Sequence, residues 1–333
     1  MKTKLKNKIS FVIAMYFTFC LSYIFSQDCS EGYTFYDTLP TTATILEGNS
    51  ELMDSCLSAI DLITLDDIIT DNSLDYSDPI NVGNQTWEDG RLKGLVASYE
   101  PNGTSGVNAQ LTSIPESIGN LSELAFLYLE WNSLIVLPNS FSQLTNLFSL
   151  TINNNWLTSL PGDFGNLNNL LFLDLGYNQI NSIPESICEL DNLQYLYLFN
   201  NQLESVPDCI CELNIDWSGW LAGFPYFGIG ANQLCDDVPD CIENSENFEL
   251  TLDQFYYSFP VDAPQNCCPD MGDLNGDGGW NVLDIVALAN CVLAVNCTTL
   301  GNGCAGDMNG DGGYNVLDIV ALANCVLAAN CGG

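Results

Sequence analysis

Residues 121–143 read LSELAFLYLEWNSLIVLPNSFSQ, and three further segments of the same length follow the same pattern. They are LTNLFSLTINNNWLTSLPGDFGN (144–166), LNNLLFLDLGYNQINSIPESICE (167–189) and LDNLQYLYLFNNQLESVPDCICE (190–212). Each carries an LxL-type triplet, then an asparagine, then an aliphatic residue followed by proline. The triplet predicts a short strand with its aliphatic side chains pointing inward. Because one segment cannot bury its apolar face alone, the copies are expected to stack into a curved solenoid.

The repeated residues match the LxxLxLxxNxL signature, and the chain resembles leucine-rich repeat proteins of the 23-residue type. A degraded copy precedes the four, at 111–121, and another follows an insertion of about eight residues, at 229–242. The resemblance covers residues 94–245. It implies an α/β leucine-rich repeat solenoid in which the asparagine satisfies backbone groups where the chain turns. We expect an N-terminal helical cap, with a helix over 51–70, and a small all-α calcium-binding C-terminal domain.

Side chains that alternate with the inward leucines form the concave surface in folds of this kind, and here they are rich in aromatic residues. Exposed aromatic rings among amides and acids suit either a protein partner or the faces of a glycan, and an exposed apolar patch of this size is unusual without a partner. The competing interpretation is that these side chains only cover the sheet. The candidate ligand-binding residues are Phe126, Tyr128, Glu130, Trp131, Phe172, Asp174, Tyr177, Tyr195, Tyr197 and Phe199.

A second duplication lies near the C-terminus, where residues 272–297 (GDLNGDGGWNVLDIVALANCVLAVNC) recur at 306–331 (GDMNGDGGYNVLDIVALANCVLAANC). Each copy alternates carboxylates and amides around glycines, then continues as an apolar run that predicts a helix, at 282–295 and at 316–329. Calcium prefers about six to eight hard oxygen ligands, which this alternation supplies. We therefore predict two Ca²⁺ sites. The candidate ligands are Asp273, Asn275, Asp277, Gly279, Asn281 and Asp284 in the first copy, and Asp307, Asn309, Asp311, Gly313, Asn315 and Asp318 in the second.

The pattern DxNxDGxxNxxD followed by one helix, present twice, resembles type I dockerin modules. Such modules commonly join a protein to a cohesin receptor, through loop positions 10 and 11 and along the helix. Here those loop positions hold Val282-Leu283 and Val316-Leu317, and the basic pair usual farther along the helix is absent. The residues therefore favour an apolar docking surface, and the partner is either cohesin-like or another surface protein.

The charge balance limits the possible partners. The chain has a formal net charge of −36, and nothing after Lys93 is Lys, Arg or His. Such a chain repels nucleic acids and anionic membranes and favours cations.

Residues 1–26, with lysines before an apolar stretch, predict a signal peptide, with a membrane anchor as the alternative. Cleavage leaves a secreted or cell-surface protein with no further membrane span.

Fourteen of the fifteen cysteines remain after cleavage of the predicted signal peptide, and this even number in an exported chain indicates disulfides rather than zinc sites. Cys29 and Cys56 form the simplest N-terminal pair. Cys188 and Cys211 occupy equivalent positions in adjacent repeats, as do Cys209 and Cys241, so each of these pairs is a candidate disulfide, with reduced buried cysteines as the alternative. Spacing leaves open the pairing of Cys235, Cys267, Cys268, Cys291, Cys297, Cys304, Cys325 and Cys331.

The residues argue against an enzyme. The absence of histidine excludes Ser-His-Asp, Cys-His and histidine-metal catalysis, and nothing places two carboxylates in one cleft.

We expect a non-catalytic binding protein whose solenoid recognises a protein or glycan and whose tail mediates attachment. Two alternatives are a component of a cellulosome-like, polysaccharide-degrading complex, and a structural surface protein whose tail is a stability cap. The expected divisions are 1–26 signal peptide, 27–93 acidic cap region, 94–245 solenoid, 246–269 C-terminal cap and linker, and 270–333 dockerin-like domain.

Overall fold

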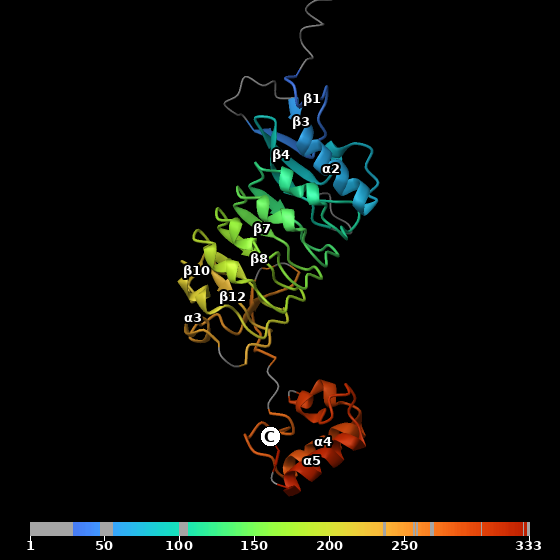
Figure 1. The fold of residues 1–333 in the computed structure, drawn as a ribbon, viewed down its shortest axis with the longest axis vertical. Coiled ribbons are helices and arrows are strands. Elements are labelled where there is room, and N and C mark those ends of the chain that lie inside the picture. Colours follow the sequence, from blue (N-terminus) through green and yellow to red (C-terminus); the bar gives the residue numbers. More distant parts are fainter. Residues whose placement is uncertain are drawn as a thin grey trace, which may run out of the picture. The chain divides into compact units, whose positions relative to one another are not determined.

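The computed structural model divides into two compact units, residues 1–232 with 238–264 and residues 233–237 with 265–333 (Figure 1). The structure describes residues 29–46, 56–99, 106–235, 238–255, 257, 259–266, 270–300, 302–328 and 330–331. The predicted signal peptide, 1–26, and Cys267 and Cys268 lie outside the described residues. None of the helices in the described ranges has the length and hydropathy needed to cross a bilayer.

The larger unit is a leucine-rich solenoid built on an eight-stranded sheet, in the order β12-β9-β8-β7-β6-β5-β4-β2. The strands from β5 to β12 are parallel, whereas β4 pairs with β5 antiparallel. The repeated triplets form β6 to β9, as predicted. The strand bounds are β2 Ala43–Leu46, β4 Asn84–Glu88, β5 Arg91–Val96, β6 Phe126–Tyr128, β7 Ser149–Thr151, β8 Phe172–Asp174, β9 Tyr195–Tyr197 and β12 Phe227–Gly228.

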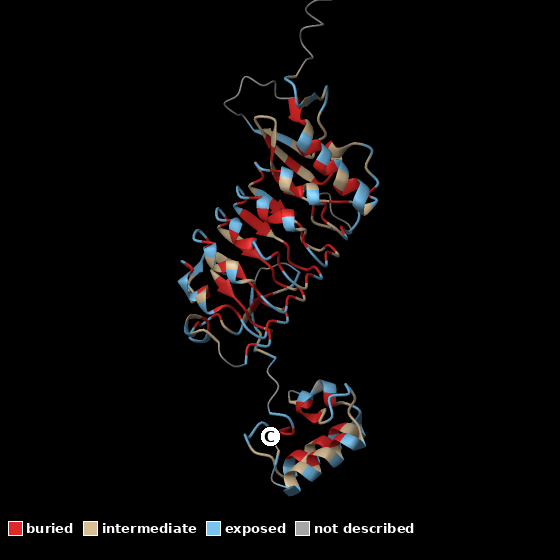
Figure 2. Ribbon diagram, viewed as in Figure 1, coloured by how far each residue is buried: buried red, intermediate tan, exposed pale blue. Residues whose placement is uncertain are grey.

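A short 3-10 helix follows the aliphatic–proline pair in each repeat. These helices are η2 Glu116–Asn120, η3 Asn139–Gln143, η4 Phe164–Asn166, η5 Glu185–Glu189 and η6 Asp208–Glu212, and α3 Asp240–Glu243 takes the same place in the last repeat. The central leucines of the four strand triplets are fully buried, so the stacked repeats share one continuous apolar core (Figure 2). That core is what stabilises repeats that could not fold singly.

Buried asparagines run through the solenoid at the turn after each strand. Asn178 shows the geometry: its Nδ2 donates to the carbonyls of Leu175 and Ile152 at 3.0 and 3.1 Å, and its Oδ1 accepts from the backbone N–H of Leu157 at 3.0 Å. The equivalent residues that bond in the same way are Asn132, Asn155, Asn201 and Asn232. The predicted backbone-satisfying role of the asparagine is confirmed.

The N-terminal region is a mixture of strands and a helix rather than a helix alone. Helix α2, Ala59–Asn72, begins after Ser58, whose side chain accepts from Asp61 N–H. Residues at 56–58, expected to be helical, instead form β3, which pairs with β1, Tyr33–Phe35. The buried Asp61 carboxylate accepts from Arg91 at 2.8 and 3.0 Å, which connects α2 to β5. A 3-10 helix, η1 Pro79–Asn81, leads into β4.

Two hairpins interrupt the regular repeats. The insertion of about eight residues forms β10, Trp220–Leu221, and β11, Phe224–Pro225. After the last repeat, β13, Leu250–Leu252, pairs with β14, Pro260–Asp262. Neither hairpin belongs to the main sheet, but both contribute to the surface described below.

The smaller unit is helical. Helices α4, Val282–Ala294, and α5, Val316–Ala328, agree with the predicted 282–295 and 316–329 to within one residue. Two 3-10 helices, η7 Cys297–Thr299 and η8 Gly303–Gly306, lie between them. The core contains Leu274, Leu288 and Leu322, of which the last two are fully buried.

Disulfides join cysteines throughout the described chain. The predicted pair Cys29–Cys56 is present, with Cα atoms 5.6 Å apart. In the smaller unit, Cys291–Cys297 and Cys325–Cys331 each bond a helix to the residues just after it. Cys235 and Cys304 are also disulfide-bonded.

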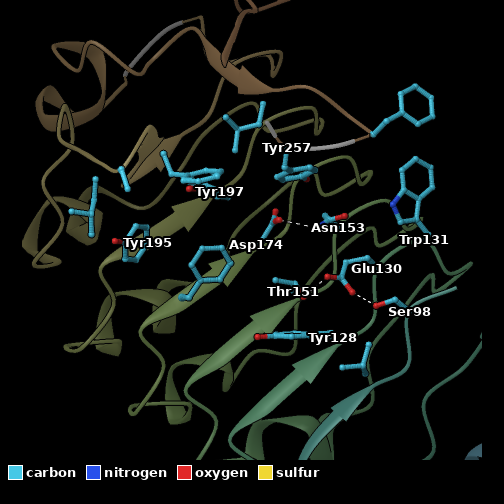
Figure 3. A pocket seen from close by; sticks show the side chains of 17 residues that line it. Ser98, Tyr128, Glu130, Trp131, Thr151, Asn153, Asp174, Tyr195, Tyr197 and Tyr257 are labelled. Carbon is cyan, nitrogen blue, oxygen red and sulfur yellow. Dashed lines mark hydrogen bonds between the residues drawn. The ribbon is translucent and has the colours of Figure 1, made fainter. Parts of the chain in front are cut away.

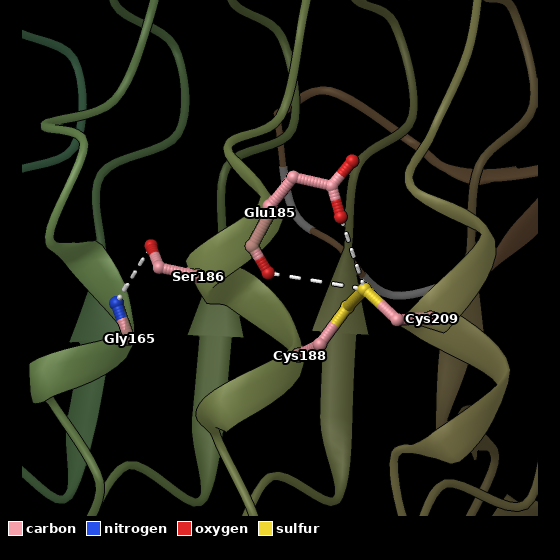
Figure 4. Close-up of a disulfide and its surroundings, with 5 residues drawn as sticks. All are labelled: Gly165, Glu185, Ser186, Cys188 and Cys209. Atoms are coloured by element: carbon pink, nitrogen blue, oxygen red, sulfur yellow. Dashed lines mark hydrogen bonds between the residues drawn. A yellow bond between two sulfur atoms is a disulfide. The ribbon is translucent and has the colours of Figure 1, made fainter.

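The predicted pairs Cys188–Cys211 and Cys209–Cys241 are wrong. The structure joins Cys188 to Cys209 (Figure 4). It also joins Cys211 to Cys241. Side chains at equivalent positions in adjacent repeats point the same way, so they do not face each other. The spacing argument also applied to strands, whereas these cysteines lie in the 3-10 helices and α3.

Candidate functional site

A pocket of about 690 Å³ lies over the outward side chains of β6 to β9, which we call the concave face (Figure 3). Strand pairing aligns Phe126, Ser149, Phe172 and Tyr195 in one row and Tyr128, Thr151, Asp174 and Tyr197 in the next. The pocket is lined by Val96, Ser98, Tyr128, Glu130, Trp131, Thr151, Asn153, Phe172, Asp174, Tyr195, Tyr197, Leu221, Ala222, Phe224, Leu252, Phe255 and Tyr257.

Seven of the ten candidate ligand-binding residues line this pocket: Tyr128, Glu130, Trp131, Phe172, Asp174, Tyr195 and Tyr197. The other three do not. Phe126 is 43% exposed on the sheet but lies outside the pocket. Phe199 is fully buried in a cluster with Tyr197 and Leu252, against which Tyr177 packs. The prediction that Phe199 is a surface residue is therefore wrong, because the segment around β13 covers it.

The walls of the pocket include side chains that sequence reasoning missed. Leu221 and Phe224 come from the β10–β11 hairpin, and Leu252, Phe255 and Tyr257 come from β13 and the residues after it. Phe255 stacks on Trp131 with ring centroids 5.7 Å apart. The aromatic residues clustered at 217–227 and 255–259 were the available signal, but no periodicity connected them to the sheet.

The pocket brings together two carboxylates, Glu130 and Asp174, so the expectation that no cleft holds two of them is wrong. Both are held by neutral donors. Glu130 accepts from the hydroxyls of Thr151, at 2.8 Å, and Ser98. Asp174 is buried and accepts from Asn153 Nδ2 at 2.7 Å and from the backbone N–H of Gly176 at 2.9 Å. Figure 3 shows the side-chain bonds. These bonds fix the orientation of both carboxylates without neutralising them.

Burial changes the acidity of this group of residues. Loss of hydration raises the pKa of Asp174 to about 7; the charge of Glu130 adds to the shift, and the bonds from Gly176 and Asn153 oppose it. Burial also raises the pKa of Tyr257, whose hydroxyl is enclosed without a partner in hydrogen-bonding geometry, and that of Tyr197. The pocket therefore holds a carboxyl group that titrates near neutral pH.

The duplicated loops of the smaller unit share one hydrogen-bond pattern. In the first, Asp273 accepts from the backbone N–H groups of Gly276 and Gly278, both at 2.8 Å, and Asp277 accepts from Gly279. Gly276 and Gly278 have φ of 71° and 76°, a conformation that favours glycine. The buried Asp284 caps α4 by accepting from Asn281 N–H at 2.9 Å.

The second loop repeats this geometry 34 positions later. Asp307 accepts from Gly312 N–H at 2.9 Å, Asp311 from Gly313 at 2.8 Å, and Asp318 from Asn315 at 2.8 Å. Asp318 Oδ1 is buried and has no hydrogen-bond partner. A buried carboxylate oxygen without a partner, in a domain that lacks any basic side chain, fits a cation ligand. Among the described residues, no group of three acidic or cysteine side chains lies close enough to hold a metal ion. Side-chain amide oxygens and backbone carbonyl oxygens would therefore have to complete the coordination of a cation.

Comparison with known families agrees with both halves of this description. Residues 145–203 match the leucine rich repeat family, and residues 271–327 match the dockerin type I domain. The chain carries a leucine-rich repeat domain and a type I dockerin domain. Type I dockerin domains typically bind calcium, and both families are typically non-catalytic. No curated protein is significantly similar to the chain.

Several solved structures resemble the leucine-rich repeat domain. A leucine-rich repeat protein of Leptospira interrogans is 33% identical over 42% of this chain and 39% of that one, with a TM-score of 0.34. The ectodomain of the receptor kinase SOBIR1 from Arabidopsis thaliana is 24% identical over 52% and 92%, with a TM-score of 0.42. A plant ice-binding protein is 21% identical over 57% and 61%, with a TM-score of 0.42. The chain thus spans well under half the length of the Leptospira protein.

The dockerin domain exposes matching apolar residues at the start of both helices. Val282 and Leu283 are 64% and 61% exposed, and Val316 and Leu317 are 63% and 62% exposed. Leu293 and Leu327, near the helix ends, are more exposed still. These side chains are not part of the buried domain core, which contains Leu288 and Leu322 of the same helices together with residues outside them, such as Leu274 and Ala305.

Proposed function

We propose that this chain is an exported, non-catalytic binding protein that captures a protein or glycan in the pocket on its leucine-rich repeat domain. The observation that carries the proposal is the pocket itself. Side chains of five consecutive strands, β5 to β9, and of two additional hairpins converge on one cavity, although the repeats alone would leave an open sheet face. Concave, mostly apolar cavities with a few fixed polar groups are the usual form of a ligand site.

The dockerin domain is the proposed means of attachment. We infer two Ca²⁺ sites, one in each loop, with Asp273, Asn275, Asp277, Gly279, Asn281 and Asp284 as ligands in the first and Asp307, Asn309, Asp311, Gly313, Asn315 and Asp318 in the second. The repeated hydrogen-bond pattern and the unpartnered Asp318 oxygen support this assignment. Bound calcium would supply the positive charge that the domain lacks.

The partner of the dockerin domain is proposed to be cohesin-like or another surface protein that presents an apolar face. Exposed valine and leucine at equivalent places on α4 and α5 support docking by hydrophobic contact. In the alternative, the chain is a non-catalytic component of a polysaccharide-degrading assembly, and its dockerin domain docks through the same exposed valine and leucine side chains. It would differ only in the ligand of the pocket, which would then be a polysaccharide.

The full-length mature chain, immobilised as bait, tests both roles. Baits carrying Tyr195→Ala in the pocket or Leu283→Asp with Leu317→Asp on the dockerin domain are compared with the unaltered bait, with calcium and with chelator. Partners lost only with the dockerin variant or chelator identify the attachment role, and ligands lost only with Tyr195→Ala identify the pocket. Capture that neither variant changes would refute the proposal. A glycan array probed with the same three proteins distinguishes a protein ligand from a sugar.

A further inference from the structure

The pocket contains negative charge that no basic residue compensates. Glu130 and, above its pKa of about 7, Asp174 supply this charge, and none of the residues that line the pocket is Lys or Arg. The two basic residues after position 8 are already paired elsewhere, Arg91 with the buried Asp61 and Lys93 with Glu123 at 2.8 Å. A ligand that brings a positive charge would therefore complete the pocket, whereas an anionic one would be repelled.

The polar groups at the centre of the pocket are mainly acceptors that neighbouring donors hold in place. The carboxylate oxygens of Glu130 and Asp174 already accept from Ser98, Thr151, Asn153 and a backbone N–H. The hydroxyl of Tyr197 donates to the carbonyl of Pro225 at 2.8 Å. What the two carboxylates offer a ligand is a negative potential and the lone pairs that these bonds leave free.

Aromatic rings supply the remaining surface. Tyr128, Trp131 and Tyr195 line the pocket around the two carboxylates, as Figure 3 shows. Phe172 lines it as well. The face of an aromatic ring attracts a cation within about 6 Å of its centre, by about 0.5–2 kcal/mol. Rings and carboxylates together suit an organic ammonium group, which carries a positive charge next to apolar carbon atoms.

We propose that the pocket on the leucine-rich repeat domain binds an alkylammonium group, held between its aromatic rings and the carboxylates of Glu130 and Asp174. This inference rests on the proposed function, because it specifies the ligand class of the same pocket. The group comes either from a small free molecule with a quaternary ammonium or from a lysine side chain of a protein partner. The chemistry is shared, and the two sources are separable by experiment.

Calorimetric titration of the full mature chain in calcium-containing buffer tests the proposal with two matched probe pairs. Choline is compared with 3,3-dimethyl-1-butanol, its neutral isostere, and Nα-acetyl-lysine amide with its Nε-acetylated form. We expect one site, with the charged member of at least one pair binding about tenfold more tightly than the neutral member. A preference for choline indicates a free small molecule, and a preference for the lysine derivative indicates a protein partner.

Variants locate the binding in the pocket. Glu130→Gln keeps the shape and an acceptor for Thr151 but removes the charge, so it is expected to weaken binding about tenfold. Asp174→Asn provides a second test at the same site. Glu204→Gln, an exposed residue outside the pocket, removes one charge from elsewhere and is expected to leave affinity unchanged.

Three results would overturn the inference. Equal affinity for the charged and neutral probes would show that charge is irrelevant, and equal weakening by Glu130→Gln and Glu204→Gln would show non-specific attraction to an acidic protein. If the protein binds cellohexaose but neither cation, and Tyr195→Ala blocks the binding of cellohexaose, the ligand is a neutral glycan. In that last case the pocket remains a ligand site and the proposed function stands, whereas loss of all pocket-dependent capture in the bait experiment would refute the proposed function itself.

Discussion

Cys188 and Cys209 are bonded across two adjacent repeats at an offset of 21 residues, with Cα atoms 5.8 Å apart. The same offset joins Gly165 to Ser186 one repeat earlier, where the Gly165 N–H donates to the Ser186 hydroxyl at 3.2 Å (Figure 4). The disulfide therefore replaces a hydrogen bond at the equivalent place in the solenoid. Residues of neighbouring 3-10 helices therefore meet at an offset of 21 residues, two fewer than the repeat length of 23.

This offset predicts the result of disulfide mapping. Proteolysis of the non-reduced protein is expected to yield a peptide pair containing Cys188 and Cys209 and another containing Cys211 and Cys241. Cys188→Ser with Cys209→Ser removes one complete bond and is expected to lower the free energy of unfolding by about 3 kcal/mol, because the unfolded chain loses a constraint on a loop of 21 residues. Mass spectrometry decides the pairing, and recovery of a Cys188–Cys211 peptide would contradict it.

The asparagine ladder makes a second prediction. Asn178→Ala leaves several buried backbone groups without partners and is expected to cost roughly 3–5 kcal/mol of stability. Asn169→Ala is the matched control, because its side chain makes one exposed bond, to the carbonyl of Thr145. Its expected cost is below about 1 kcal/mol. Urea unfolding monitored by far-ultraviolet circular dichroism gives both values, and similar losses for the two variants would argue against the ladder.

Asp174 makes stability depend on pH. Its pKa rises from 3.8 to about 7 on folding, so between these values the folded state holds more protons than the unfolded state. The free energy of unfolding therefore falls as pH increases over this range, by at most roughly 4 kcal/mol, and this loss is complete above the folded pKa. Asp174→Asn should remove this contribution and flatten the profile.

The measurement is the urea midpoint of the solenoid from about pH 5 to about pH 8, with slopes compared rather than absolute values. The substitution also changes the bond to Asn153, which shifts the whole curve but not its slope. Asp163→Asn, at an exposed position, serves as the control for the loss of an acid. Parallel profiles for the unaltered protein and Asp174→Asn would disprove the role of this carboxyl.

Calcium binding gives the fourth prediction. We expect two Ca²⁺ per chain by calorimetry, and one after either Asp284→Ala or Asp318→Ala, since each removes a buried carboxylate from one loop. A chelator should lower the melting temperature of the dockerin domain, because the ions bind the folded loops. Asp270→Asn, an exposed residue just outside the first loop, is expected to change neither quantity. A stoichiometry that both alanine variants leave unchanged would rule out these ligands.

The repeats and the dockerin domain were predictable because their signals are local and repeated. The leucine spacing placed β6 to β9 and aligned Phe172 with Tyr195, and the duplicated block located α4 and α5 to within one residue. The hairpins that wall the pocket carry no such period. Their positions depend on long-range contacts, such as the hydrogen bond from the Tyr177 hydroxyl to the carbonyl of Leu252 at 2.7 Å, which composition and spacing do not reveal.

The two disulfides of the last repeats also determine how this chain would respond to tension. A protein held at one domain by a surface and at the other by its ligand is pulled along its length, and repeats would peel away one by one. The bonds close loops of 21 and 30 residues, so about 180 Å of chain cannot extend until a covalent bond is reduced. The last repeats of the solenoid thus resist stretching until one of these two bonds is reduced.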